Sequence, residues 1–430
     1  MREIGIGILG FGTVGAGVVE GLIKNGDIMA ERLGARPVLR KIADLDITSD
    51  RGVEVDKSIL TTDAAAVIDD PGIDIIVELI GGCGIALDFV RKALSAGKAV
   101  VTANKKLLAE HGAELYELAD RHNVDLCFEA SVGGGIPIIK SLREALCANR
   151  INSIYGILNG TCNYILTKME TEGLAFDTVL KDAQEQGFAE ADPGLDIDGF
   201  DTAHKAVILS SLACGHPVEM DAVGVEGIRG ISSTDIKYAL SMGYRIKLIA
   251  LVRREASELE ALVAPMLVPL DNMLASVNGV FNAVMVNSDL DDTTLYYGRG
   301  AGRLPTGSAV LGDICDIVRS RADGVACRMP AIPASGKRIT LKPSAQIKSK
   351  YYLRIDTSEQ ETFDKCASLV AECGIAVESI EKYTESSCPG PTVVIITGMA
   401  EEKEIETAVE KIRALDIVSG DVVKLRVMPV

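Results

Sequence analysis

The start of the chain constrains its fold more than any other segment does. Residues 4–9 (IGIGIL) form an apolar run typical of a buried strand, and an amphipathic helical pattern begins at Val18. Between them stands a Gly-x-Gly-x-x-Gly motif made of Gly10, Phe11, Gly12, Thr13, Val14 and Gly15. Between a strand and a helix, such glycines permit a tight turn, close approach of a pyrophosphate and close helix packing. The helix N-terminus then favours the phosphate charge, so we predict a dinucleotide site; a glycine turn without ligand is the alternative.

Strand-like runs recur through the first third of the chain and alternate with helical stretches. They lie at residues 38–43, 73–80, 99–103 and 124–128. This alternation predicts an α/β fold with a doubly wound parallel sheet of the Rossmann type. We place this nucleotide-binding domain at residues 1–137.

The second predicted strand ends near Asp44, where an acid binds the ribose 2′-hydroxyl and favours NAD. Asp44 comes later than the usual spacing of about 20 residues, which we attribute to an inserted loop at residues 25–37. Three bases would instead meet the 2′-phosphate of NADP: Arg40, Lys41 and Lys57. The sequence therefore favours NAD and leaves the use of both cofactors open.

Residues 183–205, AQEQGFAEADPGLDIDGFDTAHK, gather several acids before one lysine, Lys205. Five of these acids stand between Gly187 and Lys205: Glu190, Asp192, Asp196, Asp198 and Asp201. If a helix begins near Asp201, Asp201 and Lys205 share one face, while Pro193 and Gly194 turn the preceding acids back toward it. The segment predicts a pocket that binds a cationic group beside a proton donor; a solvated acidic loop is the alternative.

This segment resembles the signature of homoserine dehydrogenases, Ala-x3-Gly with Asp-Pro-x2-Asp-x2-Gly-x-Asp-x3-Lys. The matching residues are Ala183, Gly187, Asp192, Pro193, Asp196, Gly199, Asp201 and Lys205. The resemblance covers the whole chain and implies NAD(P)-dependent interconversion of L-aspartate 4-semialdehyde and L-homoserine in threonine and methionine biosynthesis. It implies Lys205 as the acid/base, oriented by Asp201. Glu190 is expected to bind the substrate ammonium and Asp196 to lie near the reacting oxygen.

Further strings carry the same resemblance. The string of residues 102–105, Thr-Ala-Asn-Lys, implies that Lys105 contacts cofactor and substrate, although position alone leaves a solvated lysine equally open. The string of residues 159–165 implies that Gly160 and Thr161 meet the substrate, with an ordinary helix cap as the alternative. Gly187 and Gly302 are expected beside the cofactor. In relatives the chain returns to the nucleotide-binding domain near the position of Gly302. Residues 300–325 are therefore expected to complete this domain. NADP-preferring relatives often carry a base beside Asp44, where this chain has Ala43.

Three consecutive glycines, residues 133–135, follow Glu129. From chemistry alone a flexible hinge is favoured, although exposed carbonyls and a carboxylate also suit a hard cation. The string resembles the family's sodium site, which implies the Glu129 carboxylate and the backbone carbonyls of Val132, Gly134 and Ile136 as ligands. Such an ion would be structural.

The rest of the chain is expected to form two further domains. Residues 138–299 read as an α+β catalytic domain, whose sheet forms the dimer interface in the family, so a homodimer or homotetramer is implied. Residues 326–347 carry three prolines and read as a linker. Residues 348–430 show a βαββαβ order, typical of a ferredoxin-like unit, with a capping box at Ser358 and Glu361. This unit resembles an ACT domain and implies an amino-acid effector, threonine being a candidate; a dimerisation module is the alternative.

Composition excludes several classes of partner. With 61 acids against 44 bases the net charge is -17, which argues against nucleic acid and anionic membranes. No apolar run reaches the roughly 18 residues of a membrane span, and no signal peptide is recognised, so a cytoplasmic protein is expected. The ten scattered cysteines disfavour structural zinc. A dehydrogenase of another small amino aldehyde and a non-catalytic amino-acid sensor remain as alternatives.

Overall fold

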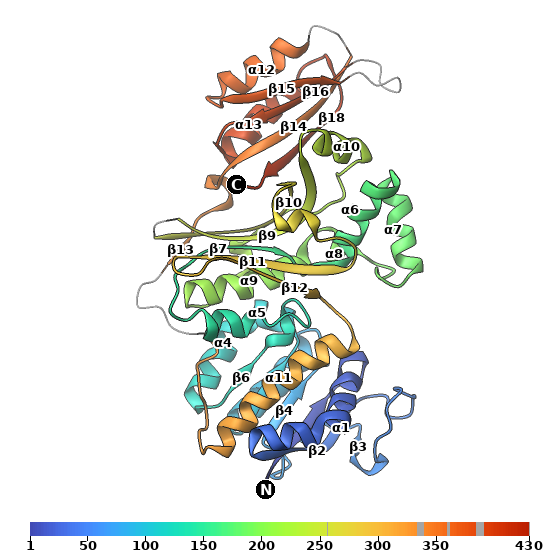
Figure 1. Cartoon of the computed structure of the whole chain (residues 1–430), viewed down its shortest axis with the longest axis vertical. Helices are drawn as coiled ribbons and strands as arrows, with labels where there is room; N and C mark the ends of the chain where they lie inside the picture. The colour runs from blue at the N-terminus through green and yellow to red at the C-terminus, as the bar shows by residue number, and fades with distance from the viewer. Residues whose placement is uncertain (256, 333–338, 359–361, 384–390, 430) are drawn as a thin grey trace. The chain divides into compact units, whose positions relative to one another are not determined.

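The computed structural model describes residues 1–255, 257–332, 339–358, 362–383 and 391–429 (Figure 1). The chain divides into two compact units. Unit 1 takes residues 1–154, 204–221 and 281–339, and unit 2 takes residues 155–203, 222–280 and 340–430. The domain boundaries expected from the sequence remain predictions.

A parallel sheet of six strands forms the centre of unit 1, in the order β3-β2-β1-β4-β5-β6. The strands are β1 (Arg2–Leu9), β2 (Ala35–Ala43), β3 (Leu60–Thr61), β4 (Ile75–Glu78), β5 (Ala99–Thr102) and β6 (Leu126–Cys127). The order reverses between β1 and β4, and sheets of this kind bind ligands outside the carboxyl ends of the strands at such a point. The predicted parallel α/β sheet is confirmed.

Helix α1 (Thr13–Leu33) corrects one expectation, because residues 25–33 belong to this helix and not to an inserted loop. Met29, Ala30 and Leu33 continue its buried face, and the helix ends at Gly34 with a φ of 70°. β2 then starts at Ala35. The spacing between the glycine motif and Asp44 is therefore longer than usual because α1 is long.

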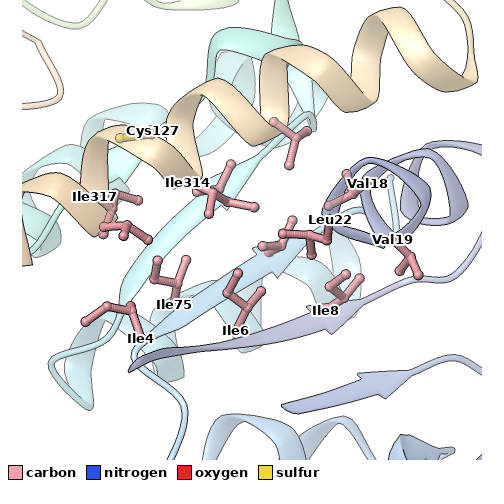
Figure 2. Packing of buried hydrophobic residues seen from close by; sticks show 14 of the residues in the cluster. Ile4, Ile6, Ile8, Val18, Val19, Leu22, Ile75, Cys127, Ile314 and Ile317 are labelled. Carbon is pink, nitrogen blue, oxygen red and sulfur yellow. The ribbon is translucent and has the colours of Figure 1, made fainter. Parts of the chain in front are cut away.

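The core of unit 1 lies where β1 packs against α1 and α11 (Arg303–Ala322) (Figure 2). Its labelled members include Ile4, Ile6, Ile8, Val18, Leu22, Ile75, Ile314 and Ile317. Residues far apart in sequence thus share one core, because α11 lies beside α1. Gly17 and Gly307 make this approach possible, since a Cβ at Gly17 would lie 2.1 Å from the carbonyl oxygen of Arg303.

The remaining elements of unit 1 surround this sheet or follow it. The helices are α2 (Ala64–Ile68), α3 (Gly84–Ser95), α4 (Lys105–His122), α5 (Ile138–Lys140), a π-helical turn (Ser141–Ala145) and 3-10 turns at Lys57–Ile59 and Glu129–Ser131. Strands β11 (Phe281–Ser288) and β12 (Asp292–Arg299) form an antiparallel hairpin. The boundary between the units falls within β7 (Ile151–Ile157), within α9 (Phe200–Cys214) and within the 3-10 turn Met220–Ala222.

Unit 2 contains a mixed sheet in the order β9-β10-β18-β14-β16-β15. The long strands are β9 (Tyr244–Glu255), β10 (Glu258–Pro269), β14 (Lys348–Thr357), β15 (Val377–Tyr383), β16 (Thr392–Thr397) and β18 (Val418–Val427). Short strands add to β10 or β14: β8 (Gly224–Val225), β13 (Thr340–Leu341) and β17 (Ala400–Glu401). The helical elements are α6 (Gly160–Glu172), α7 (Phe176–Glu185), α8 (Gly194–Ile197), α10 (Ser233–Ser241), α12 (Thr362–Glu372), α13 (Glu402–Arg413) and 3-10 turns at Met273–Ser276 and Ser344–Gln346.

The C-terminal part of unit 2 has the predicted βαββαβ topology. Its four strands pair antiparallel in the order β18-β14-β16-β15, which is fourth, first, third and second along the segment. Cys366 and Val370 of α12 are buried as expected from the helical pattern, and Gly374 has a φ of 80° directly after this helix. Phe363 and the expected capping box at Glu361 lie outside the described side chains.

No helix among the described residues combines the length and the apolar character that a membrane crossing requires.

Candidate active site

The glycine motif of unit 1 has the geometry of a phosphate-binding turn. Gly10 has a φ of 100°, and a Cβ there would lie 2.7 Å from the carbonyl oxygen of Leu79. A Cβ at Gly15 would lie 2.2 Å from the carbonyl oxygen of Gly10. At Gly12, which caps α1, a Cβ would meet nothing within 4 Å, so this face of the turn is open. The backbone of Gly12 and the start of α1 can therefore receive a pyrophosphate.

Asp44 follows β2 and reaches the glycine turn. Its Oδ2 accepts a hydrogen bond from the backbone N–H of Phe11 at 2.5 Å, and its Oδ1 accepts one from Asp46 at 2.9 Å. The guanidinium of Arg51 lies 3.5 Å from the same carboxylate. The sequence offered no signal for Arg51, which stands in a loop without a motif.

Two of the three bases considered for an NADP phosphate have other described partners. Arg40 pairs with Glu3 at 2.5 Å, and Lys41 pairs with Asp70 at 2.8 Å. Lys57 opens a 3-10 turn. Of the described bases, Arg51 is the one that the structure places beside Asp44. Arg51 is therefore a stronger candidate than Arg40 for binding the 2′-phosphate of NADP.

Two loops meet at the carboxyl ends of β4 and β5. Glu78 is fully buried, and its carboxylate accepts hydrogen bonds from the Thr102 hydroxyl at 2.6 Å and from the Ile80 N–H at 2.8 Å. The Asn104 side chain donates to the carbonyl of Gly82 at 2.6 Å and caps α4. Lys105 is the first residue of α4, so it stands at the edge where parallel sheets bind ligands.

In unit 2, Asn159 joins two of the predicted acids. Its side-chain nitrogen donates to Oδ1 of Asp196 at 2.7 Å and to Oδ2 of Asp201 at 2.9 Å. Its side-chain oxygen accepts the N–H of Cys162 at 2.8 Å and so caps α6. Asn159 is 5% exposed. The sequence showed it within a family string, but only the fold reveals that it bridges both carboxylates.

The helix expected near Asp201 exists as α9, which starts at Phe200 after Gly199 with a φ of 87°. Asp201 and Lys205 lie one turn apart on it. Lys205 is 8% exposed, so most of this residue is removed from solvent. The structure thus brings Asp196 and Asp201 together and buries Lys205 one turn further along the same helix.

The other substrate candidates occupy different positions in unit 2. Glu190 lies on an exposed loop, where its carbonyl accepts a hydrogen bond from Gln184 at 3.1 Å. Thr161 is not the cap of α6; its hydroxyl donates to the carbonyl of Phe188 at 2.6 Å. Gly160 is the first residue of α6. Gly187 has a φ of 75° in the same loop region as Glu190, and Gly302 in unit 1 has a φ of 128° before α11.

Glu129 lies in a buried polar cluster of unit 1. Its carboxylate accepts the N–H groups of Ile139 at 2.9 Å and Lys140 at 2.7 Å, while its own N–H donates to Asp313 at 2.9 Å. Burial raises the pKa of Glu129 to about 7 and raises that of Asp313 well above its ordinary value. The cluster thus holds two carboxyl groups at a buried site, where their ionised forms are unfavourable.

The glycines after Glu129 pack closely against the segment before α11. A Cβ at Gly134 would lie 2.5 Å from the carbonyl of Gly300, and the N–H of Gly135 donates to the carbonyl of Arg299 at 3.1 Å. The carbonyl of Ile136 accepts the N–H of Ile138 at 2.8 Å. This close packing favours a fixed turn over the flexible hinge.

Two parts of the chain match family profiles. Residues 137–315 match the homoserine dehydrogenase family, and residues 10–129 match the NAD binding domain of homoserine dehydrogenase. The first match contains the segment with Asn159, Asp196, Asp201 and Lys205, and the second contains the glycine motif.

The chain is also similar over its length to known homoserine dehydrogenases. It is 44% identical over 437 aligned positions to that of Neisseria gonorrhoeae and 42% identical over 432 to that of Pseudomonas aeruginosa, with 99% of both chains covered in each case. A crystal structure of a homoserine dehydrogenase from Thiobacillus denitrificans superposes with a TM-score of 0.92 at 39% identity, covering 100% of this chain and 99% of that one.

A hyperthermophilic archaeal homoserine dehydrogenase in complex with NADPH covers 73% of this chain and 97% of its own, with a TM-score of 0.63 and 28% identity. An enzyme that binds NADPH is therefore among the structures similar to the chain. The chain belongs to the homoserine dehydrogenase family.

Proposed function

We propose that the protein is an NAD(P)-dependent homoserine dehydrogenase that interconverts L-aspartate 4-semialdehyde and L-homoserine. The observation that carries the proposal is the Asn159 side chain, which holds Asp196 and Asp201 of the family signature at 2.7 and 2.9 Å. The same chain contains an open glycine turn that suits a dinucleotide. The glycine turn suits the cofactor that carries the hydride, and the acidic signature suits the amino-acid aldehyde that receives it.

Lys205 is proposed as the acid/base. A bound nicotinamide cofactor would supply or accept the hydride at the carbon that carries the reacting oxygen. During reduction, Lys205 gives a proton to the oxygen as charge develops on it, and during oxidation Lys205 takes the hydroxyl proton. Because Lys205 is only 8% exposed, this proton transfer takes place with little access for bulk water. Asp201, one turn earlier on α9, is proposed to orient the ammonium.

Substrate binding is assigned to charged groups around these residues. Glu190 is proposed to accept the substrate ammonium, and its exposed loop gives the amino acid a point of entry. Asp196 is proposed to lie near the reacting oxygen. The start of α6, with Gly160 and Thr161, suits the substrate carboxylate because helix N-termini favour anions.

Cofactor binding is assigned to the glycine turn, Asp44 and Lys105. Asp44 suits the two ribose hydroxyls of NAD, while Arg51 at 3.5 Å supplies the cation that a 2′-phosphate needs. We propose that the enzyme uses both cofactors. Lys105 is proposed to stabilise charge on the substrate oxygen, and Gly187 and Gly302 to allow close approach of the nicotinamide.

A sodium ion is proposed near Glu129, with the carbonyls of Val132, Gly134 and Ile136 as further ligands. The donor set is all oxygen, which suits a hard cation, and a cation would offset the cost of burying Glu129 beside Asp313. Both Glu129 oxygens already accept backbone N–H groups, so each would use its second lone pair. Such an ion would fix the turn without entering the chemistry.

The C-terminal βαββαβ segment is proposed to be an ACT domain through which an amino acid, threonine being the candidate, regulates the enzyme. Its ferredoxin-like strand order supports this proposal. A homodimer or homotetramer is proposed, and light scattering of the purified protein measures it.

Absorbance at 340 nm tests the proposed reaction. Purified protein with L-homoserine is expected to reduce NAD, NADP or both at alkaline pH. A panel of other small amino and hydroxy alcohols measures the substrate preference. If homoserine failed to reduce either nucleotide while another alcohol succeeded, the substrate assignment would be wrong.

A further inference from the structure

A cysteine, a glutamate and a histidine meet in unit 1 at a place that the proposed reaction does not use. Cys83 caps α3, in the loop that follows β4, while Glu110 and His111 are neighbours on α4. The Sγ atom of Cys83, a carboxylate oxygen of Glu110 and a ring nitrogen of His111 all lie within 4.8 Å of one another. Among the residues that the structure describes, this is the one group of such side chains close enough to share a metal ion.

The helices that carry these side chains are held together independently of any ion. α3 packs beside α4, and the guanidinium of Arg91 on α3 donates to both carboxylate oxygens of Glu114 on α4, at 2.5 and 2.6 Å. Glu114 stands about one turn after Glu110 on the same helix. The Cys83 thiol already donates to Oε2 of Glu110 at 3.0 Å. The fold of unit 1 therefore brings the three potential ligands together.

The separations between the ligand atoms suit a tetrahedral ion. Zinc with sulfur at about 2.3 Å and with nitrogen and oxygen at about 2.0–2.2 Å holds these atoms about 3.4–3.6 Å apart. The Cys83 and Glu110 atoms are slightly closer than this, and no pair in the group exceeds 4.8 Å. Side-chain shifts of about 1 Å would therefore bring all three atoms to an ion. Cys83 and His111 are half-buried and Glu110 is exposed, so an ion can reach the group from solvent.

The ligand types select among metals. Thiolate and imidazole suit zinc, whereas Mg²⁺ and Ca²⁺ prefer ligand sets made of oxygen. Three protein ligands leave the fourth position of a tetrahedral zinc ion to water, unlike the closed four-ligand sites of structural zinc. The cysteine spacings in the sequence do not indicate such a site, because its ligands come from two helices and only one of them is a cysteine.

The charges around Cys83 also suit a cation. Burial and the adjacent Glu110 carboxylate raise the pKa of Cys83 to about 11, so the free thiol is protonated at neutral pH. Zinc would displace this proton: the S–H bond breaks, a Zn–S bond forms and the proton leaves to solvent. Glu78 adds negative charge, whereas Lys106 opposes the ion, since its ammonium lies 3.8 Å from Oε1 of Glu110. Two carboxylates and a thiolate would thus face one ammonium.

We propose that Cys83, Glu110 and His111 form a binding site for Zn²⁺, with one coordination position left to solvent. A bound ion would link the start of α3 to α4 and fix the loop that contains Gly81 and Gly82. This inference goes beyond the proposed function and does not rest on it, because the ion takes no part in the hydride transfer.

Isothermal titration calorimetry of the full chain, reduced and freed of metal, tests the site with Zn²⁺ and Mg²⁺ as probes. Zn²⁺ is expected to bind at a single site per chain, and Mg²⁺ is not expected to bind. Co²⁺ in place of Zn²⁺ is expected to give a thiolate-to-cobalt charge-transfer band, which identifies a cysteine ligand. Absence of Zn²⁺ binding, or Co²⁺ binding without this band, would overturn the proposal.

Cys83→Ser and His111→Gln locate the ion. Each removes a ligand, so each is expected to weaken Zn²⁺ binding by at least the roughly tenfold to hundredfold that loss of an outer-shell partner costs. Cys147→Ser and His122→Gln are the matched controls, because both residues are exposed and lie outside the group. Unchanged affinity in both site variants, or an equal loss in the controls, would contradict the site.

Thermal unfolding gives a second readout. Zn²⁺ is expected to raise the unfolding midpoint of the wild type more than that of Cys83→Ser, because the ion binds only the folded arrangement of α3 and α4. An equal rise in both proteins would contradict the proposal. Circular dichroism without metal confirms that the variants are folded. Homoserine turnover is measured separately on the same preparations, and its failure would bear on the proposed function alone.

Discussion

The side-chain nitrogen of Asn159 lies 2.9 Å from Oδ2 of Asp201, in the first turn of α9. The same nitrogen contacts Asp196, so one buried amide fixes two carboxylates of the family signature. A neutral donor between two acids reduces their repulsion and sets their spacing. Asn159 is therefore expected to act through the acids as a positioning residue.

Asn159→Ala is predicted to lower kcat by roughly ten- to hundredfold, because a hydrogen bond to a charged group contributes about 1.5–3 kcal/mol. The loss of the α6 cap should also cost about 1 kcal/mol of stability. Asn159→Asp tests the donor without loss of the cap, since it keeps a capping oxygen and replaces the donor with a carboxylate that repels both acids. If Asn159→Asp kept wild-type kcat in a steady-state assay, the positioning role would be refuted.

Arg51→Gln is predicted to raise KM for NADP by roughly ten- to hundredfold and to change KM for NAD little, since only NADP carries a phosphate for this cation. The measurement is KM for both cofactors with L-homoserine saturating. Arg40→Gln is the matched control, because Arg40 pairs with Glu3 instead. An unchanged ratio of the two KM values would contradict the role of Arg51.

Lys247 of β9 provides a test of pH dependence. It is 1% exposed, donates to Asn163, Val277 and Asn278, and burial lowers its pKa from 10.5 to about 8. Between these values the unfolded chain binds more protons than the folded one, so stability rises with pH. Below pH 8 the folded protein bears the full cost of the buried charge.

The free energy of unfolding of the wild type relative to Lys247→Met is therefore predicted to increase by about 3 kcal/mol between pH 8 and pH 10.5. Urea unfolding of both proteins across this range measures the difference. Lys181→Met, at an exposed lysine of α7, should show no such trend. A difference that stayed flat or fell with pH would show that Lys247 is not buried as a charged group.

A chain that ends at residue 347 is predicted to keep homoserine turnover and to lose its response to L-threonine. It should also be less stable, because β18 pairs with β10 at Met266 and Leu267. Initial rates with and without threonine measure the response, and circular dichroism confirms folding. A folded but inactive truncation would show that the segment is structural.

Much of the fold could be predicted because it depends on local pattern. The glycine motif lies between a strand and a helix, and the C-terminal segment has the expected strand order. The error at residues 25–33 has a physical cause. Gly26 and the polar residues near it suggest a loop, but Met29, Ala30 and Leu33 bury a face that only the packed helix reveals.

The site could be predicted where one segment carries it and not where distant segments meet. Asp201 and Lys205 share a helix, so their spacing in sequence already indicates their alignment. Asn159 lies far from Asp196 in sequence, and Arg51 reaches Asp44 from an irregular loop. Such contacts depend on which distant segments the tertiary fold brings together, and the local hydrophobic pattern of the sequence does not contain this information.

The central claim is that Lys205 transfers the proton in this reaction. Lys205→Ala is predicted to abolish turnover of L-homoserine, followed at 340 nm, and to leave cofactor affinity nearly unchanged in a parallel titration. Lys181→Ala serves as the control for loss of a lysine. A Lys205→Ala enzyme that kept more than a tenth of wild-type kcat would contradict the account. Loss of turnover with intact cofactor binding is the result that the account predicts.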